Sequence, residues 1–457
     1  MDIKQHKSKV LSMIGAVCLA MPVLFLERTV AAGILCTLGF MLLLCGGGCA
    51  GTKSDVIANA VFMWAGYTLR FCGLFGEEFI YTLYCALIFV PYCVLMAMSL
   101  WLERLLRRAE HPIFSILSIL VMPTVYALIS YVLAVLNIGY ITNLMGYAMC
   151  IPVIGVNLSW FGEYGLTFIL MLIFLCFSSI PSESKKRTRL VYGAVGGLLS
   201  AFLLMNGAAL QNRYKEPDYT LRVALATSQE MDFIGENGVF YTEDQQIALF
   251  TEAVKEASES GASLLMLNEE YFLWNEENAP ELLEDISGIV LQYRMPTLIG
   301  VDITTQEGPD INEAVYFDEN GEILYTYVKN NLVPFIEVGS YEDGVEEPAL
   351  LSVTLDGHSV ELAYIICYDI NDDMYLRKIP ASVELLLVPS WDWDTENIEQ
   401  TRTAARSASL GVTLIKHSFD GFSTVSCPNG KVTEQIDLRG CYETVTTVSV
   451  PIWERPY

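Results

Sequence analysis

The sequence predicts a multi-span α-helical membrane domain followed by an α/β domain, and three observations support this. The chain has 457 residues, 53% hydrophobic and only 18% charged, which is too apolar for an ordinary soluble protein. Residues 1–210 hold 13 basic and 9 acidic residues, whereas residues 211–457 hold 14 and 44, so the net charge divides into +4 and −30. Near residue 221 the apolar runs also shorten from membrane-span length to strand length. We therefore assign 1–210 to a transmembrane domain, 211–220 to a linker and 221–457 to a second domain.

The first part contains seven uncharged apolar runs near the roughly 20 residues that a helix needs to cross a bilayer. The runs are 10–26, 30–45, 56–69, 79–102, 112–136, 164–180 and 190–210; five are long or strongly apolar, and those at 56–69 and 164–180 are less so. No small-residue cleavage site follows Leu26, so the first run is interpreted as a retained span and not as a signal peptide.

Three basic clusters set the orientation, since Lys and Arg beside a span stay on the cytoplasmic side. They lie at 4–9, 104–108 and 185–189, and seven spans with a cytoplasmic N-terminus place all three inside. An eighth helix within the apolar stretch 137–163 would put the last cluster outside. We therefore interpret 137–163 as an outer loop or re-entrant segment, which either contacts lipid or packs on neighbouring helices. The acidic second domain is then extracytoplasmic.

The second domain alternates strands with helices. Strand-like runs lie at 221–227, 263–267, 296–301, 360–367 and 384–388, and helices are predicted after Thr242 and at 280–293 and 396–410. Thr242 and Gln245 form a capping-box pattern. Hairpin turns are predicted at Asn320-Gly321, Asp356-Gly357 and Asn429-Gly430. The domain is therefore mixed α/β, with one well-buried core or a two-layer sheet covered by helices.

Composition excludes several partners. The chain has four histidines without paired spacing, which leaves zinc without ligands, and we expect no metal and no cofactor. Neither half carries the concentrated Lys/Arg surface that nucleic acid requires, so we expect no nucleic-acid partner. The acidity of the second domain is most simply a solvated surface.

Three strand ends carry candidate catalytic side chains. A buried strand ends in Glu269, Lys329 leaves a second strand, and Cys367 ends a third. A thiol near pKa 8.5 needs a base and a nearby cation to become a nucleophile, and a carboxylate and a lysine supply these. Each residue also has an ordinary structural interpretation: Cys367 as a small buried hydrophobe, Lys329 as a surface lysine, and Glu269 as interchangeable with its neighbour Glu270.

Together the three segments resemble the carbon–nitrogen hydrolase (nitrilase) superfamily, whose members place a glutamate, a lysine and a cysteine after successive strands in this order. With a multi-span N-terminal half, they resemble its apolipoprotein N-acyltransferase family. The segment Lys-Asn-Asn-Leu-Val-Pro-Phe-Ile-Glu at 329–337 is close to the family's K-x-H-L-V-P-F-G-E, and Ile-Cys-Tyr-Asp at 366–369 is close to I-C-Y-E. The sequence departs from the family pattern at Asn268, Asn331, Ile336 and Asp369.

The resemblance implies an αββα sandwich for the second domain and a role for each matched residue. Glu269 is the implied general base, Lys329 the catalytic lysine and Cys367 the nucleophile. Glu337, Tyr368 and Asp369 are implied supporting residues of the active site.

The implied reaction is an N-acyl transfer. A fatty acyl chain would move from a phospholipid, through a cysteine thioester, to the N-terminal amine of a diacylated lipoprotein at the bacterial cell membrane. We expect a monomer. We further expect the face around Cys367 to be depleted of carboxylates apart from Glu269, Glu337 and Asp369, since anionic head groups would repel others.

Two other functions are considered beside the transferase. A membrane-tethered amidase would share the triad, with water as the second nucleophile. A catalytically inactive, acidic ligand-binding or scaffolding domain would not need the triad at all.

Overall fold

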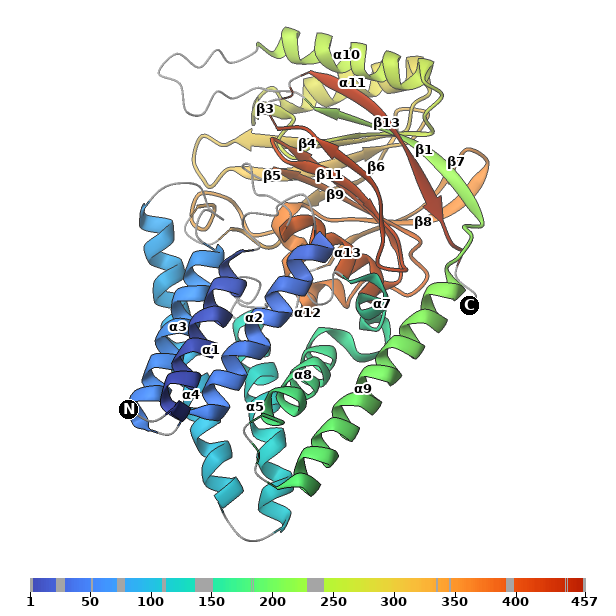
Figure 1. The fold of residues 1–457 in the computed structure, drawn as a ribbon. Helices are drawn as coiled ribbons and strands as arrows, with labels where there is room; N and C mark the ends of the chain where they lie inside the picture. The colour runs from blue at the N-terminus through green and yellow to red at the C-terminus, as the bar shows by residue number, and fades with distance from the viewer. Residues whose placement is uncertain are drawn as a thin grey trace. The chain divides into compact units, whose positions relative to one another are not determined.

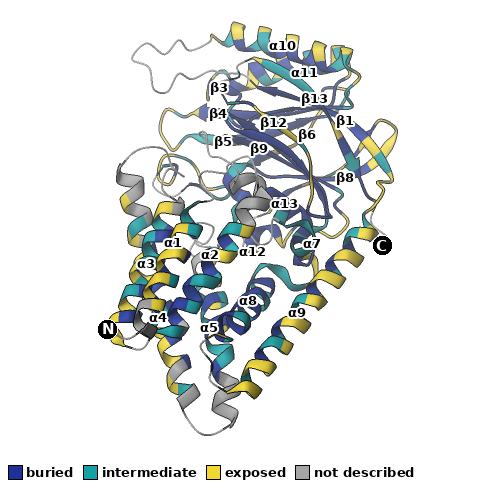
Figure 2. Ribbon diagram, in the orientation of Figure 1, coloured by how far each residue is buried: buried dark blue, intermediate teal, exposed yellow. Residues whose placement is uncertain are grey.

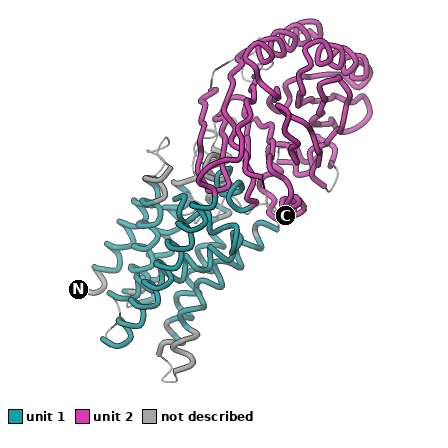
Figure 3. Tube along the Cα trace, turned by 90° about the vertical axis from the view of Figure 1, so that its right-hand side faces the viewer, with its two compact units in different colours: residues 1–213, 397–409 teal, residues 214–396, 410–457 magenta. Residues whose placement is uncertain are grey.

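The computed structural model describes two compact units (Figure 3). Unit 1 comprises residues 1–213 and 397–409, and unit 2 comprises residues 214–396 and 410–457. The residues described are all except 1–2, 22–28, 51, 72–78, 109–111, 136–150, 182, 184, 228–241, 334–335, 345–346, 392–397, 440, 442 and 455–457.

Unit 1 is helical, and each of the seven predicted apolar runs overlaps one of its long helices. In order, these are α1 (Ile3–Ala20), α2 (Thr29–Cys49), α3 (Lys53–Phe71), α4 (Phe79–Arg108), α5 (Pro112–Val135), α8 (Leu158–Ser179) and α9 (Lys186–Arg213) (Figure 1). One buried apolar cluster, with members such as Phe40, Tyr92 and Met171, joins α2, α3, α4, α5, α8 and α9.

By length and composition, α8 and α9 are the two helices in the described part of the chain that could cross a membrane. Shorter apolar stretches lie at Ile34–Gly47, Phe89–Glu103 and Ser118–Val132. Much of α9 is exposed in Figure 2, including Leu198 at 72% and Met205 at 74%. Exposed apolar surface on this scale indicates contact with lipid or with another apolar partner. The seven-span domain itself remains a prediction.

The predicted outer segment 137–163 is only partly within the described residues. Its described residues contain the short helix α7 (Pro152–Gly155), a two-residue turn and the start of α8, which has a kink at Gly162 (φ 64°). The interpretation of 137–163 as an outer loop or re-entrant segment stays a prediction.

One helix of the predicted second domain packs in unit 1 instead. Helix α13 (Ile398–Leu410) overlaps the helix predicted at 396–410, and its buried Arg406 pairs with Glu163 of α8 at 3.1 Å. Its Ala405 packs against the apolar cluster of unit 1. The predicted linker 211–220 is also shorter in the structure, because α9 continues to Arg213 and the first strand begins at Tyr219.

Unit 2 contains a seven-stranded sheet and a six-stranded sheet. In the first, the strand order is β13-β1-β2-β4-β5-β6, and β3 also pairs with β4. These strands are β1 (Tyr219–Thr227), β2 (Leu264–Leu267), β3 (Phe272–Asn275), β4 (Thr297–Thr304), β5 (Ile311–Phe317), β6 (Ile323–Val328) and β13 (Thr444–Ile452). Helices α10 (Glu243–Glu259) and α11 (Ala279–Tyr293) cover one face of this sheet through a shared apolar cluster (Figure 1). The predicted Thr242–Gln245 capping box begins α10.

The second sheet has the order β12-β11-β10-β9-β8-β7. Its strands are β7 (Ala349–Leu355), β8 (His358–Tyr364), β9 (Leu385–Trp391), β10 (Thr413–Phe419), β11 (Phe422–Ser426) and β12 (Val432–Asp437). Residues of both sheets, such as Met266 and Leu386, form one buried core, so the sheets pack face to face. The three predicted turns connect antiparallel pairs, β5 to β6, β7 to β8 and β11 to β12.

Parallel pairing places the candidate residues at matching strand ends. Strands β1, β2 and β4 are parallel, and so are β8, β9 and β10. Strand β6 is antiparallel to β5, which is antiparallel to β4, so β6 runs in the direction of β2. Side chains that follow β2 and β6 therefore emerge at one edge of their sheet.

Candidate active site

Glu269 is a buried carboxylate, 2% exposed, two residues beyond β2. Its Oε1 accepts hydrogen bonds from Lys329 Nζ at 2.7 Å and from Asn312 Nδ2 at 2.9 Å. Its Oε2 accepts from the backbone N–H of Trp391 at 2.8 Å. Three donors thus hold the carboxylate in one orientation, which a general base requires.

Lys329 follows β6 directly and is 1% exposed. Its ammonium bonds Glu269 at 2.7 Å and Glu337 Oε1 at 2.6 Å. Burial disfavours the charged form, but Glu269, then Glu337 and Cys367, outweigh it and raise the pKa of Lys329 well above 10.5. Lys329 is therefore a cation fixed between two carboxylates and not a surface lysine.

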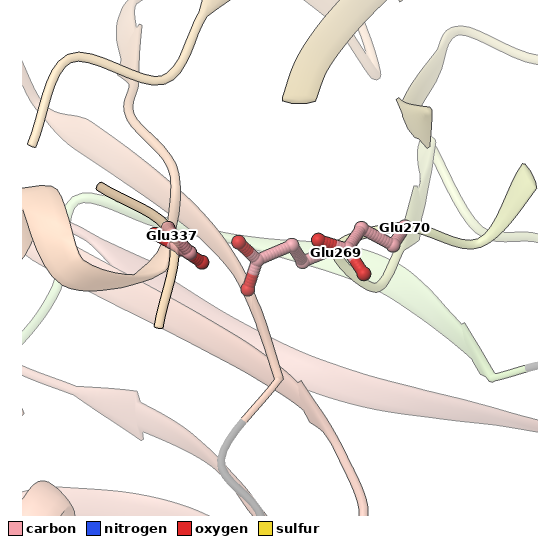
Figure 4. Close-up of side chains that lie close together, drawn as sticks. All are labelled: Glu269, Glu270 and Glu337. Carbon is pink, nitrogen blue, oxygen red and sulfur yellow. The ribbon is translucent and has the colours of Figure 1, made fainter. Parts of the chain in front are cut away.

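Glu337 completes this arrangement from the loop after β6. Its Oε2 accepts from the backbone N–H of Val333 at 2.7 Å, which orients the carboxylate toward Lys329. Glu269 lies between Glu337 and Glu270 in Figure 4. Oxygens of these three carboxylates lie within 4.8 Å of one another, a grouping that could hold a metal ion. The Lys329 ammonium already bonds two of the three, so a cation is present there without a metal.

Cys367 lies just beyond β8, which ends at Tyr364 and not at 367 as predicted. It begins a short 3₁₀ helix, η3 (Cys367–Asn371), with a left-handed φ of 42° that is unusual for a residue other than glycine. The half-buried Sγ lies 3.8 Å from the carbonyl oxygen of Trp391, whose N–H binds Glu269. The end of β9 therefore contacts both the thiol and the carboxylate.

Tyr368 and Asp369, the other two predicted supporting residues, are both buried. Asp369 accepts hydrogen bonds from the Ile366 N–H at 2.9 Å, the Asn331 N–H at 2.6 Å and the Tyr327 hydroxyl at 2.7 Å. Burial raises the pKa of Asp369 to about 6, although these hydrogen bonds favour its charged form. Asp369 holds the loop after Lys329 against the backbone next to Cys367, so it acts on the position of both.

The sequence analysis missed a group of polar residues beside Glu269. Asn312 of β5 donates to Glu269 and also to Glu270 Oε1 at 3.1 Å. The Tyr341 hydroxyl lies 3.5 Å from the same Glu270 oxygen and 3.2 Å from Asp302 Oδ2. Glu270 and Asp302 are two further carboxylates beside Glu269, and the expected depletion of carboxylates on the face around Cys367 stays a prediction. In the sequence, this group could have been noticed only from three polar residues that interrupt otherwise apolar strands, Asp302, Asn312 and Glu313.

Asp302 predicts a specific pH dependence of stability. Burial, together with nearby Asp310, raises the pKa of Asp302 to about 7 from 3.8. The folded state then binds this proton more tightly than the unfolded state, so ionisation of Asp302 costs stability as the pH rises through that window. The free energy of unfolding of Asp302→Asn, relative to the parent, should therefore rise between pH 3.8 and about 7 by at most about 1.4 kcal/mol per pH unit. Above about pH 7 the difference should stay constant.

Thermal unfolding in detergent, followed by intrinsic fluorescence across that pH range, measures the difference. Glu276→Gln, at an exposed position, is the matched control and should run parallel to the parent. If the stability of Asp302→Asn also followed that of the parent at every pH, the raised pKa of Asp302 would be contradicted.

Gly300 of β4 is a second residue that only the structure reveals. A Cβ there would meet the carbonyl oxygen of Asn268 and come within 3.0 Å of Glu269 Cα. Gly300→Ala should therefore displace Glu269, the predicted general base. A shift near 1 Å in a catalytic group costs about 100-fold in rate, so the variant should lower the kcat of the predicted acyl transfer by that factor.

The control is Gly288→Ala in α11, where a Cβ meets nothing within 4 Å and should leave activity unchanged. Steady-state assays compare the kcat of both variants with that of the parent, at equal concentrations of folded protein. Equal activities would show that the β4 backbone does not set the position of Glu269.

Comparisons with known proteins concern about half of the chain. No protein-family model matches it. A curated protein, "Hydrolase in agr operon" from Staphylococcus lugdunensis, is 23% identical over 198 residues, covering 38% of this chain and 83% of that protein.

Solved structures that this chain resembles include several of one amidase. The amidase from Nesterenkonia sp. is 22% identical with a TM-score of 0.44, covering 50% of this chain and 90% of that one. A mutant of the Nesterenkonia AN1 amidase, described as a nitrilase-superfamily protein, is 21% identical with a TM-score of 0.43, covering 50% and 91%. Another mutant of that amidase, with acrylamide added at its active-site cysteine, is 21% identical with a TM-score of 0.43, covering 50% and 92%. At these values the similarity does not decide what this chain acts on.

Proposed function

We propose that unit 2 transfers an acyl group through a thioester on Cys367. The observation that carries the proposal is the buried Lys329 ammonium held between Glu269 and Glu337, 2.7 Å and 2.6 Å from their oxygens. Trp391 relates Cys367 to this group, since its carbonyl oxygen lies 3.8 Å from Cys367 Sγ and its N–H donates to Glu269 at 2.8 Å. A fixed base, a fixed cation and a thiol in one place are the parts that covalent acyl transfer needs.

The first half-reaction forms the thioester. Glu269 accepts the thiol proton, and the thiolate of Cys367 attacks the ester carbonyl of a phospholipid. Lys329 and the backbone N–H of Tyr368 stabilise the oxyanion. As the carbon–oxygen bond breaks, the leaving alkoxide takes the proton from Glu269 and departs as the lysophospholipid alcohol.

The second half-reaction releases the acyl chain to an amine. The acceptor is the N-terminal amine of a diacylated lipoprotein, which loses a proton to Glu269 as it attacks the thioester carbonyl. A carbon–nitrogen bond forms, the carbon–sulfur bond breaks, and the thiolate takes back a proton. The product is an N-acylated lipoprotein.

We place this chemistry at a bacterial cell membrane, with unit 1 as a multi-pass anchor and unit 2 extracytoplasmic. The supporting observations are the apolar helices of unit 1 and the exposed apolar side chains along them. Both proposed substrates carry acyl chains, so a membrane enzyme meets them at high local concentration. We further propose that the enzyme acts as a monomer, without metal or cofactor.

One experiment separates the candidate functions. Purified full-length protein is incubated with a phospholipid and a diacylated lipopeptide, and the masses of the enzyme and the peptide are measured by mass spectrometry. A peptide heavier by one acyl chain supports the transferase. Free fatty acid with an unchanged peptide supports a hydrolase, and an enzyme that never gains an acyl group supports a binding or scaffolding role.

A further inference from the structure

Four polar residues next to the proposed base form a connected group that the mechanism above does not use. We call Glu270, Asp302, Asn312 and Tyr341 the acid cluster. Glu270 Oε1 lies 3.1 Å from Asn312 Nδ2 and 3.5 Å from the Tyr341 hydroxyl, which lies 3.2 Å from Asp302 Oδ2. Asp302 and Asn312 are directly paired across β4 and β5, so their side chains leave the same face of the sheet.

The acid cluster has more acceptors than donors. Asp302 Oδ1 and Asn312 Oδ1 are buried without a hydrogen-bond partner among the described residues. Asp302 is 8% exposed and Asn312 is 1% exposed, so water does not freely solvate these oxygens. A buried acceptor left without a donor is costly, and a ligand that donates hydrogen bonds here would remove that cost. That ligand must supply several N–H or O–H donors.

The charge of the acid cluster indicates that the ligand is a cation. Glu270 and Asp302 contribute two carboxyls, and the nearby Lys329 ammonium is already bonded to Glu269 and Glu337. A primary ammonium offers three donors and a positive charge, which matches both needs. Glu270 and Tyr341 are partly exposed, so the acid cluster can be reached from solvent.

We propose that Glu270, Asp302 and Asn312 bind the primary ammonium group of the acyl acceptor before it attacks the thioester. The proposal rests on the proposed function and deepens it, because it assigns the amine its own binding site. Asn312 Nδ2 contacts both Glu269 and Glu270, so an amine held here lies next to the base that takes its proton.

The protonation of the acid cluster agrees with a missing cation. Burial, then Glu269 and Asp302, raise the pKa of Glu270 well above its ordinary value, and burial raises the pKa of Asp302 to about 7. A bound ammonium would favour the charged form of both carboxyls. The ammonium then gives one proton to Glu269, and the neutral amine attacks the thioester carbonyl. As the carbon–nitrogen bond forms and the carbon–sulfur bond breaks, a second proton passes from the nitrogen to the departing thiolate of Cys367, and Glu269 releases its proton to water.

The test measures how the acyl-enzyme divides between a cationic and a neutral acceptor. Full-length enzyme is acylated with a p-nitrophenyl ester of a fatty acid, and the acyl group is released to n-butylamine or to methanol. Glu270→Gln and Asp302→Asn keep the side-chain shape and remove the charge. Exposed Glu276→Gln, which removes the same charge elsewhere, is the control.

Because a hydrogen bond to a charged group is worth about tenfold or more, we expect each cluster variant to lower kcat/KM for aminolysis by about that factor. The ratio of aminolysis to methanolysis should therefore fall by that factor in each cluster variant, and the control should keep the parent ratio. An unchanged ratio of aminolysis to methanolysis, or a parallel loss of both, overturns the subsite and leaves the proposed function standing. A parent enzyme that forms no acyl-enzyme overturns the proposed function and the subsite together.

Discussion

Cys367→Ala is expected to abolish acyl-enzyme formation and to lower acyl transfer by at least about 10³-fold, since loss of a nucleophile removes the covalent route. Cys367 is half-buried beside Trp391, and a smaller side chain there leaves the hydrogen bonds of Glu269 and Lys329 in place. The variant should therefore keep its fold and lose its chemistry. Intact-protein mass spectrometry after incubation with a phospholipid measures the acyl adduct directly.

A second thiol in unit 2 supplies the control. Cys441 is a partly exposed cysteine, and its Sγ lies 3.9 Å from the Asp437 carbonyl oxygen. Cys441→Ala should form the adduct at the parent rate. An adduct that persists in Cys367→Ala and disappears in Cys441→Ala would move the nucleophile to the other cysteine.

Lys329→Met should destabilise unit 2 by about 3–5 kcal/mol, because removing one partner of a buried ion pair leaves the other charge uncompensated. Here two buried carboxylates, Glu269 and Glu337, would lose their shared cation. The folded-state pKa of Lys329 lies above the unfolded value of 10.5, so its stabilisation is fully present below pH 10.5 and is lost as the pH rises through the folded pKa. The difference in the free energy of unfolding between parent and variant should therefore stay constant with pH below 10.5, while Glu269 and Glu337 are charged.

Thermal unfolding in detergent measures this deficit, and a triple variant tests its cause. Adding Glu269→Gln and Glu337→Gln to Lys329→Met removes the uncompensated charges, so it should recover much of the lost stability. It should recover no activity, because the proposed base and oxyanion cation are then both absent. A Lys329→Met variant as stable as the parent would show that the ion pairs contribute little to the fold.

Sequence reasoning placed the candidate residues Glu269, Lys329 and Cys367 at the ends of three strands, because an apolar run followed by a polar side chain marks a strand end. The structure brings Glu269 and Lys329 into hydrogen-bonding contact, and Trp391 contacts both Glu269 and Cys367. The catalytic roles of these residues remain predictions. The motif at 329–337 also identified Glu337, whose contact with Lys329 spans only eight residues of chain.

Other features depended on segments far apart in the chain. Asn312 meets Glu269 across 43 residues, and Asp302 faces Asn312 only because of the register of β4 with β5. Helix α13 was predicted as a helix, but its packing in unit 1 pairs the buried Arg406 with Glu163, which lies more than 200 residues earlier in the chain.

The sequence by itself therefore determined the helical and α/β halves, the strand ends and the residues that resemble a known triad, because periodicity and local motifs are written in neighbouring residues. Only the tertiary structure decided which unit holds α13, why β4 needs Gly300 beside Glu269, and that an acid cluster lies next to the proposed base. Strand register and close backbone approach bring together residues that no local pattern links. The proposed acceptor site is a product of that register.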